Sequence, residues 1–195
     1  MKKLIIAIAT CMIFGMADAQ DRRQMGGIYH AYPYASKADN LVDDIPEGYT
    51  PFYLSHYGRH GSRWMTNDER YEWIYSYFAD RQNLTPLGRK VEKAMRKVLD
   101  NARGNGGRLS RLGAIQHEGI ARRMYSRLPQ IFAPGNRVKA RASVVDRCVK
   151  SMQAFTAMMQ SLQPALEMDI AADSADMAWI AYTAPEVKEL EKSLY

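Results

Sequence analysis

The chain has 195 residues, of which 47% are hydrophobic and 25% are charged, and its net charge at neutral pH is +6. This length allows one domain with a sizeable core, and the composition excludes a low-complexity or disordered chain. The positive charge favours anionic partners. Because the basic residues are spread over several predicted helices, we expect a small, anionic, phosphorylated substrate and no nucleic acid.

Residues 1–19 have the pattern of an export signal. Two lysines precede an apolar stretch over residues 4–16, and residues 17–19 have the small-x-small pattern of a cleavage site before Gln20. The apolar stretch is short for a bilayer span. We therefore expect an exported protein, either periplasmic, on the outer surface or secreted, whose mature chain has no stable membrane span.

The cysteines do not indicate the cellular compartment of the protein. Cys11 lies in the predicted signal, so Cys148 is the only cysteine of the expected mature chain and an intrachain disulfide is excluded there. No cysteine or histidine cluster has the spacing of a metal site. We expect neither a metal nor another cofactor, and the oligomeric state stays open.

The first elements lead to an unusual pentapeptide. Residues 20–50, rich in tyrosine and proline, are predicted to form an irregular arm. Residues 51–57 are apolar and aromatic, which predicts a buried strand. This strand would lead into Arg59-His60-Gly61-Ser62-Arg63, called here the RHGSR segment. Glycines on both sides of His60 suit a tight turn at the carboxyl end of a strand, where open α/β sheets bind ligands.

Four helices follow, each with a recognisable start, and apolar residues at helical spacing predict their buried faces. The predicted starts are Thr66 with Glu69 as a capping box, Thr85 with Pro86, Ser110, and Ser143 with Asp146. The predicted faces are Leu87, Val91, Ala94, Met95, Val98 and Ala102 in the second helix, Leu112, Ile115, Ile120 and Leu128 in the third, and Cys148, Met152, Phe155, Met159 and Leu162 in the fourth.

Two further strands are predicted around the fourth helix. They cover residues 138–142 and 166–171, and the chain then continues into a charged helical run over residues 185–194. The alternation of strands and helices predicts an α/β fold, with parallel strands joined by helical crossovers.

The RHGSR segment carries the chemistry. A neutral imidazole can attack phosphorus without a metal, and guanidinium groups are planar clamps for phosphate oxygens. Such a pentapeptide arises by chance in a chain of this length roughly once in a thousand sequences. The pattern therefore predicts phosphoryl transfer through a phosphohistidine.

The RHGSR segment resembles the signature of the histidine acid phosphatases, the phytase-like branch of the histidine phosphatase superfamily. Residues 109–113 with Gln116 are similar to the family's L-T-x-x-G-x-x-Q helix start, and residues 141–155 are similar to the segment that supplies the next pocket arginine. The surrounding HYGRHGSRW, behind an export signal, looks most like bacterial multiple inositol polyphosphate phosphatases. The resemblance covers roughly residues 50–171.

The resemblance implies a fold and a set of roles. Residues 51–171 would be the N-terminal part of a three-layer, phosphoglycerate-mutase-like sheet flanked by helices, and residues 172–195 would begin a truncated helical insertion. His60 would be the nucleophile, and Arg59, Arg63 and Arg147 would bind the substrate phosphate. The substrate would be an inositol polyphosphate such as phytate, or 2,3-bisphosphoglycerate. Arg147 would lie in the first turn of the fourth helix, and helix N-termini favour anions.

The family's proton donor is missing from this sequence. The family places it in a late His-Asp or His-Ala-Glu segment, and neither occurs here. After His60 the only histidine is His117, which the pattern assigns to the surface or the edge of the core, while His56 is assigned a packing role. Three explanations stay open: an N-terminal fragment of a longer phosphatase, a short relative that binds phosphate without turnover, or a carboxylate among residues 173–176 acting as the acid.

The expected activity follows from that absence. We expect a phosphomonoester hydrolase that is weak or inactive as it stands, because loss of a general acid typically costs 10²–10⁴-fold in rate. The alternatives are a broad-specificity histidine acid phosphatase and a non-catalytic relative that binds phosphorylated ligands.

Overall fold

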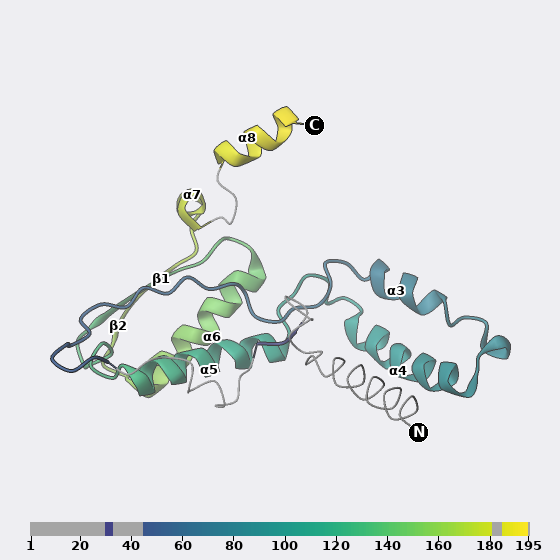
Figure 1. Cartoon of the computed structure of the whole chain (residues 1–195), viewed down its shortest axis with the longest axis horizontal. Helices are drawn as coiled ribbons and strands as arrows, with labels where there is room; N and C mark the ends of the chain where they lie inside the picture. Colours follow the sequence, from purple (N-terminus) through teal and green to yellow (C-terminus); the bar gives the residue numbers. More distant parts are fainter. Residues whose placement is uncertain (1–29, 33–44, 181–184, 195) are drawn as a thin grey trace, which may run out of the picture. The chain divides into compact units, whose positions relative to one another are not determined.

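The computed structural model describes residues 30–32, 45–180 and 185–194 (Figure 1). The predicted export signal at residues 1–19 lies outside the described residues. The chain divides into two units, residues 1–32 and 33–195. Of the first unit only residues 30–32 are described, and they are exposed. All helices and strands below belong to the second unit.

The described elements are mostly helices, with two short strands. In chain order they are α3 (Glu69–Ser76), a 3₁₀ turn (Arg81–Asn83), α4 (Pro86–Ala102), α5 (Arg111–Arg127), β1 (Arg137–Arg141), α6 (Asp146–Leu162), β2 (Glu167–Ala171), a second 3₁₀ turn (Ser174–Asp176), α7 (Met177–Ile180) and α8 (Pro185–Leu194).

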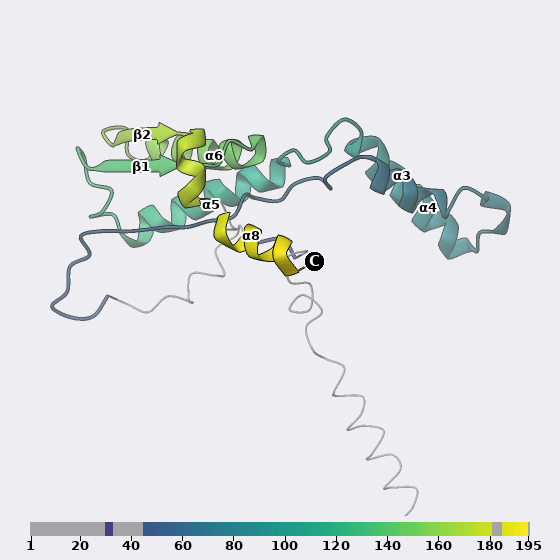
Figure 2. The ribbon, with the colours of Figure 1, turned by 90° about the horizontal axis from the view of Figure 1, so that it is seen from above.

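The sheet is a small parallel one. β1 and β2 pair in parallel, in register from Arg137 opposite Glu167 to Arg141 opposite Ala171, and Figure 2 shows the two arrows pointing the same way. α6 connects them, which gives a β–α–β unit, the ordinary way of joining parallel strands. The mixed α/β fold and both predicted strands around the fourth helix are therefore confirmed.

The main core lies between α5, α6 and the sheet. Its buried residues are Ala121, Phe132, Met159 and Leu166, and Val138 of β1 and Met168 of β2 pack against them. The predicted placement of Met159 in the core is thus confirmed. The face predicted for the third helix is wrong in detail, because Leu112, Ile115, Ile120 and Leu128 are only half-buried. The buried residues of α5 are Gly113, Gln116, His117 and Ala121.

A second cluster joins α3 to α4. Tyr71 of α3 is buried with Leu99 and Ala102 of α4. The apolar face predicted for α4 is confirmed at Ala102, which is buried, but is wrong at Leu87, Val91 and Val98, which are exposed. α4 is covered by the single helix α3 within the described residues, so it buries only a narrow strip of its surface.

Two of the four predicted helix starts are confirmed, and the other two are wrong. Thr85 and Ser110 cap α4 and α5 as predicted, accepting hydrogen bonds from the backbone N–H of Gly88 at 3.0 Å and of Gly113 at 3.1 Å. The other two starts have no side-chain cap. At α3 the carboxylate of Asp68 accepts instead from Gly104 N at 2.6 Å. α6 begins at Asp146, after the extended N-cap residue Val145, and not at Ser143.

The strand predicted over residues 51–57 is wrong. These residues have no strand assignment and pair with no other strand in the described part of the chain. Leu54 packs against the main core, and the Tyr57 hydroxyl donates to the carbonyl oxygen of Ile180 at 3.2 Å. Phe52 and Tyr53 are exposed. The segment is therefore attached at a few side chains and lacks a ladder of backbone hydrogen bonds.

Candidate active site

The RHGSR segment crosses the start of α5 at two glycines. A Cβ atom on Gly61 would overlap the backbone of Gly113, and a Cβ atom on Gly113 would overlap the carbonyl oxygen of Ser62. Only glycine permits so close an approach of two backbones. Both glycines belong to motifs that the sequence singles out, and their contact brings those motifs together.

Side chains of two helices hold the backbone of the segment. The N–H of Ser62 donates to Gln116 Oε1 of α5 at 2.8 Å, and the N–H of Gly61 donates to Ser151 Oγ of α6 at 3.1 Å. The Ser62 carbonyl accepts from the backbone N–H and the hydroxyl of Ser110, at 2.9 and 2.7 Å. Gln116 and Ser151 are both buried, so these bonds are shielded from competing water.

His60 is held in one tautomer. Its Nδ1 lies 2.8 Å from the carbonyl oxygen of Gly61, which can only accept, so Nδ1 carries the hydrogen and Nε2 carries the lone pair. Burial lowers the pKa of His60, and the charges of Arg147, Arg59 and Arg63 lower it further, against the opposing effect of the Gly61 bond. The ring is therefore neutral at neutral pH, the form in which Nε2 is a nucleophile.

The charges of the three predicted arginines reach this imidazole. Each acts on His60 through its charge, although Arg59 is exposed while Arg63 and Arg147 are half-buried. One terminal nitrogen of Arg63 donates to the carbonyl of Trp64 at 2.7 Å. The buried Nε atoms of Arg63 and Arg147 have no hydrogen-bond partner among the described residues. Buried donors without partners are costly.

Of the two positions predicted for His117, the surface is wrong. It is buried, 7% exposed, and not at the surface. Its ring hydrogen-bonds to the backbone of Arg59 and is close enough to His56 and His60 for their charges to lower its pKa, after the larger effect of burial. The signal that could have found it is the spacing of Gly113, Gln116 and His117, which puts all three on one face of α5.

His56 completes this histidine cluster. Its ring stacks on Phe155 of α6, with ring centroids 6.2 Å apart. This contact agrees with the packing role expected from the sequence, although the residue stands in an irregular segment and not in a strand.

The histidine cluster should make the protein sensitive to mild acid. Burial lowers the pKa of His56, His60 and His117 below the ordinary value of 6.5. The unfolded state therefore binds these protons at higher pH than the folded state does, so stability falls as pH drops below the unfolded value. We expect the melting temperature to fall between roughly pH 7 and pH 5. Thermal melts across this range would measure the slope.

The matched comparison uses two histidine variants. His56→Gln should flatten the pH dependence, whereas the same change at the exposed His30 should leave it unaltered. Equal slopes for both variants would contradict the assignment of the acid sensitivity to this cluster.

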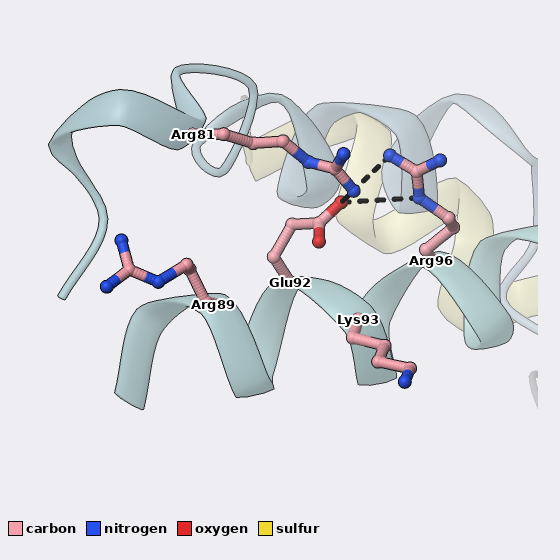
Figure 3. A pocket seen from close by; sticks show the side chains of 5 residues that line it. All are labelled: Arg81, Arg89, Glu92, Lys93 and Arg96. Carbon is pink, nitrogen blue, oxygen red and sulfur yellow. Dashed lines mark hydrogen bonds and ion pairs between the residues drawn. The ribbon is translucent and has the colours of Figure 1, made fainter. Parts of the chain in front are cut away.

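Away from the histidine cluster, cationic side chains line a hollow on α4 (Figure 3). It has a volume of about 430 Å³ and is lined by Arg81, Arg89, Glu92, Lys93 and Arg96. Figure 3 shows the guanidinium groups of Arg81 and Arg96 turned to the Glu92 carboxylate, with the end groups of Arg89 and Lys93 extending away from it. The ion-pair distances are 2.8 and 2.9 Å.

Glu92 acts as the anion of this hollow. Hydrogen bonds from Tyr75 and from Arg81, with a further one from Arg96, lower its pKa to about 2. Its carboxylate is therefore charged at any ordinary pH, and both arginines beside it are paired with it. We assign this network to the packing of α4 and not to ligand binding.

No family model matches the chain, and no curated protein matches it. Within the described residues, no helix combines the length and apolar character that a bilayer span requires. The same residues contain no group of three or more histidine, cysteine or acidic side chains placed to hold a metal ion.

Proposed function

We propose that the chain is a phosphomonoester-processing protein in which His60 accepts a phosphoryl group. The observation that carries this proposal is a neutral imidazole with a free Nε2 lone pair, whose pKa is lowered by the charges of three arginines. Two of these arginines have a buried Nε without a hydrogen-bond partner among the described residues. Arginines in a partly dry site stabilise the charge that spreads over the oxygens of a transferring phosphoryl group.

The reaction has two steps. In the first, the lone pair of Nε2 forms a bond to phosphorus, the ester P–O bond breaks, and the leaving oxygen keeps the electron pair and takes a proton from water. In the second, a water oxygen attacks phosphorus and loses a proton, the P–N bond breaks, and its electron pair returns to Nε2. The products are an alcohol, inorganic phosphate and neutral His60.

The first step would be slow without a protein acid. The carboxylate of Asp176 is paired with Arg141 at 3.4 Å, and that of Asp173 accepts from Ala175 N at 2.9 Å. Asp173 is thus bonded within its own turn, and Asp176 is paired with the end of β1. Transfer to His60 with a poor leaving group should be about 10²–10⁴-fold slower than with a positioned acid, whereas an aryl phosphate, whose leaving group needs little protonation, should react readily.

We propose inositol polyphosphates such as phytate, or 2,3-bisphosphoglycerate, as the substrate class, and export as the location. These proposals, like the finer assignment to a histidine phosphatase fold, rest on the RHGSR segment and its two companion motifs. A second candidate is a phosphoryl-binding protein without turnover, which the occupied carboxylates of the Ser174–Asp176 turn favour.

Trapping the intermediate tests the proposal. The purified chain is mixed with p-nitrophenyl phosphate, quenched in alkali, in which phosphohistidine survives, and mapped by mass spectrometry. We expect one phosphoryl group on His60, lost on brief acid treatment and missing in His60→Ala. His30→Ala is the matched control and should label normally.

The alternatives give different results. Absence of labelling, with phosphate affinity that is lost in Arg63→Gln, would favour the binding protein. Labelling at another residue, or no phosphate affinity at all, would overturn the proposal.

A further inference from the structure

A groove lies beside the proposed phosphate clamp. Its volume is about 480 Å³, and its cationic lining comes from Arg108, Arg147 and Lys150. Arg147 and Lys150 belong to the first turn and a half of α6, whereas Arg108 precedes α5. We propose that this groove is a second phosphate subsite, in which Arg108 and Lys150 hold another phosphate of the molecule that His60 attacks; this inference rests on the proposed function.

Arg147 connects the groove to His60. It lines the groove, and its charge also acts on the His60 imidazole. The backbone of Arg108 is tied to the same region, because its carbonyl accepts from Trp64 N at 3.1 Å, directly after the RHGSR segment. A molecule whose first phosphate lies between His60 and Arg147 can therefore extend into the groove without leaving the cationic surface.

The wall of the groove formed by α6 suits an anion. The helix begins at Asp146 with no side-chain cap, so no capping oxygen occupies its first N–H groups. The Asp146 carboxylate also lines the groove and is paired with Lys150. Gly106 and Gly107, which also line the groove, have no side chains, and Gly107 has the positive φ of 71° that glycine adopts readily. Both parts of the lining thus allow a ligand to approach the backbone closely.

Lys150 is available to such a ligand. Its Nζ lies 3.1 Å from Asp146 Oδ2, and both side chains are more than half exposed, at 52% and 60%. Exposed ion pairs of this kind contribute little to stability. A phosphate with nearly two negative charges can therefore compete with Asp146 for the lysine. Glu92 in the α4 hollow is different, because it is buried and holds two arginines at once.

The groove therefore selects substrates by phosphate number. A molecule with two or more phosphates would use both the clamp and the groove, whereas a monophosphate would occupy the clamp and leave the groove empty. Arg108 and Lys150 are then specificity-determining residues and not part of the reacting centre.

Calorimetric titration of the full chain tests this subsite with two probes, inositol hexakisphosphate and inorganic phosphate. The Arg108→Gln/Lys150→Gln double variant should bind the hexakisphosphate about tenfold or more weakly and inorganic phosphate within about twofold of the unchanged protein. The Arg89→Gln/Lys93→Gln double variant in the α4 hollow loses the same charge and should change neither affinity by more than about twofold.

Each other outcome has a defined meaning. Equal losses of hexakisphosphate affinity in both double variants would show a general charge effect and overturn the subsite. Equal losses for both probes in the groove variant would overturn it as well. If inorganic phosphate does not bind the unchanged protein, the proposed function fails, and the hexakisphosphate arm still decides whether the groove binds phosphate. If the groove double variant melts without a cooperative transition, the same two titrations are made with the single variant Lys150→Gln.

Discussion

Replacing Gly61 with alanine should slow phosphorylation of His60 by about 10²-fold, because a displacement of about 1 Å at a reacting group costs that much. The new Cβ atom would overlap the backbone of Gly113, and neither backbone can move without breaking hydrogen bonds to Gln116 or Ser110. Overpacking of this kind also lowers the free energy of unfolding by about 1–3 kcal/mol. Trapping rates and denaturant titrations measure the two effects.

Gly113→Ala should have the same consequences, since its Cβ atom meets Ser62 from the other side of the crossing. Gly88→Ala is the matched control. At Gly88, in the first turn of α4, the nearest atoms would lie 3.4 Å away, and alanine in a helix is more stable than glycine by about 0.5–1 kcal/mol. Normal phosphorylation in Gly61→Ala would contradict the crossing as the element that positions His60.

Replacing Arg147 with glutamine should slow phosphorylation of His60 by about 10²–10³-fold, the usual effect of removing one donor that stabilises a transition state. The same change should raise the pKa of His60, because the positive charge of Arg147 disfavours the protonated ring. An NMR titration of the histidine side chains measures this second effect, which a purely structural role of Arg147 would not produce.

Arg122→Gln on the exposed surface of α5 is the control, and it should change neither the rate nor the titration of His60. If Arg147→Gln leaves the rate and the pKa of His60 unchanged, the arginine does not face the reacting group.

The sequence predicts the local part of this structure well. β1, α6 and β2 follow from their periodicity and from Pro164, and the caps at Thr85 and Ser110 follow from single side chains. These features depend on residues near one another in the chain, where propensity and spacing are informative.

Features that depend on distant partners are predicted less well. Residues 51–57 have the composition of a strand, but a strand needs a neighbour, and composition does not show whether one exists. His117 has the same limitation, because its burial results from the RHGSR segment lying across α5, a contact between residues more than fifty positions apart. At the two uncapped helix starts, Asp68 binds Gly104 N and Val145 stays extended, outcomes that a local capping pattern cannot reveal.

For the candidate site, the sequence predicts the residues but not the contacts that hold them. The motifs name His60, Arg59, Arg63 and Arg147, and in the structure the charges of the three arginines act on the His60 ring. The sequence does not reveal what holds them, namely the Gly61–Gly113 crossing and the hydrogen bonds from Gln116 and Ser151.

The attachment of the segment at residues 61 and 62 to both α5 and α6 has a consequence for folding. Its two amide protons are bonded to side chains 90 and 54 positions away, so the segment is ordered only when both helices have docked. Contacts between residues far apart in sequence form late, because closing the intervening chain costs entropy before any bond is gained. Chemical reactivity at residue 60 would thus arise in the final stage of maturation, and an immature chain would remain unreactive until its interior had assembled.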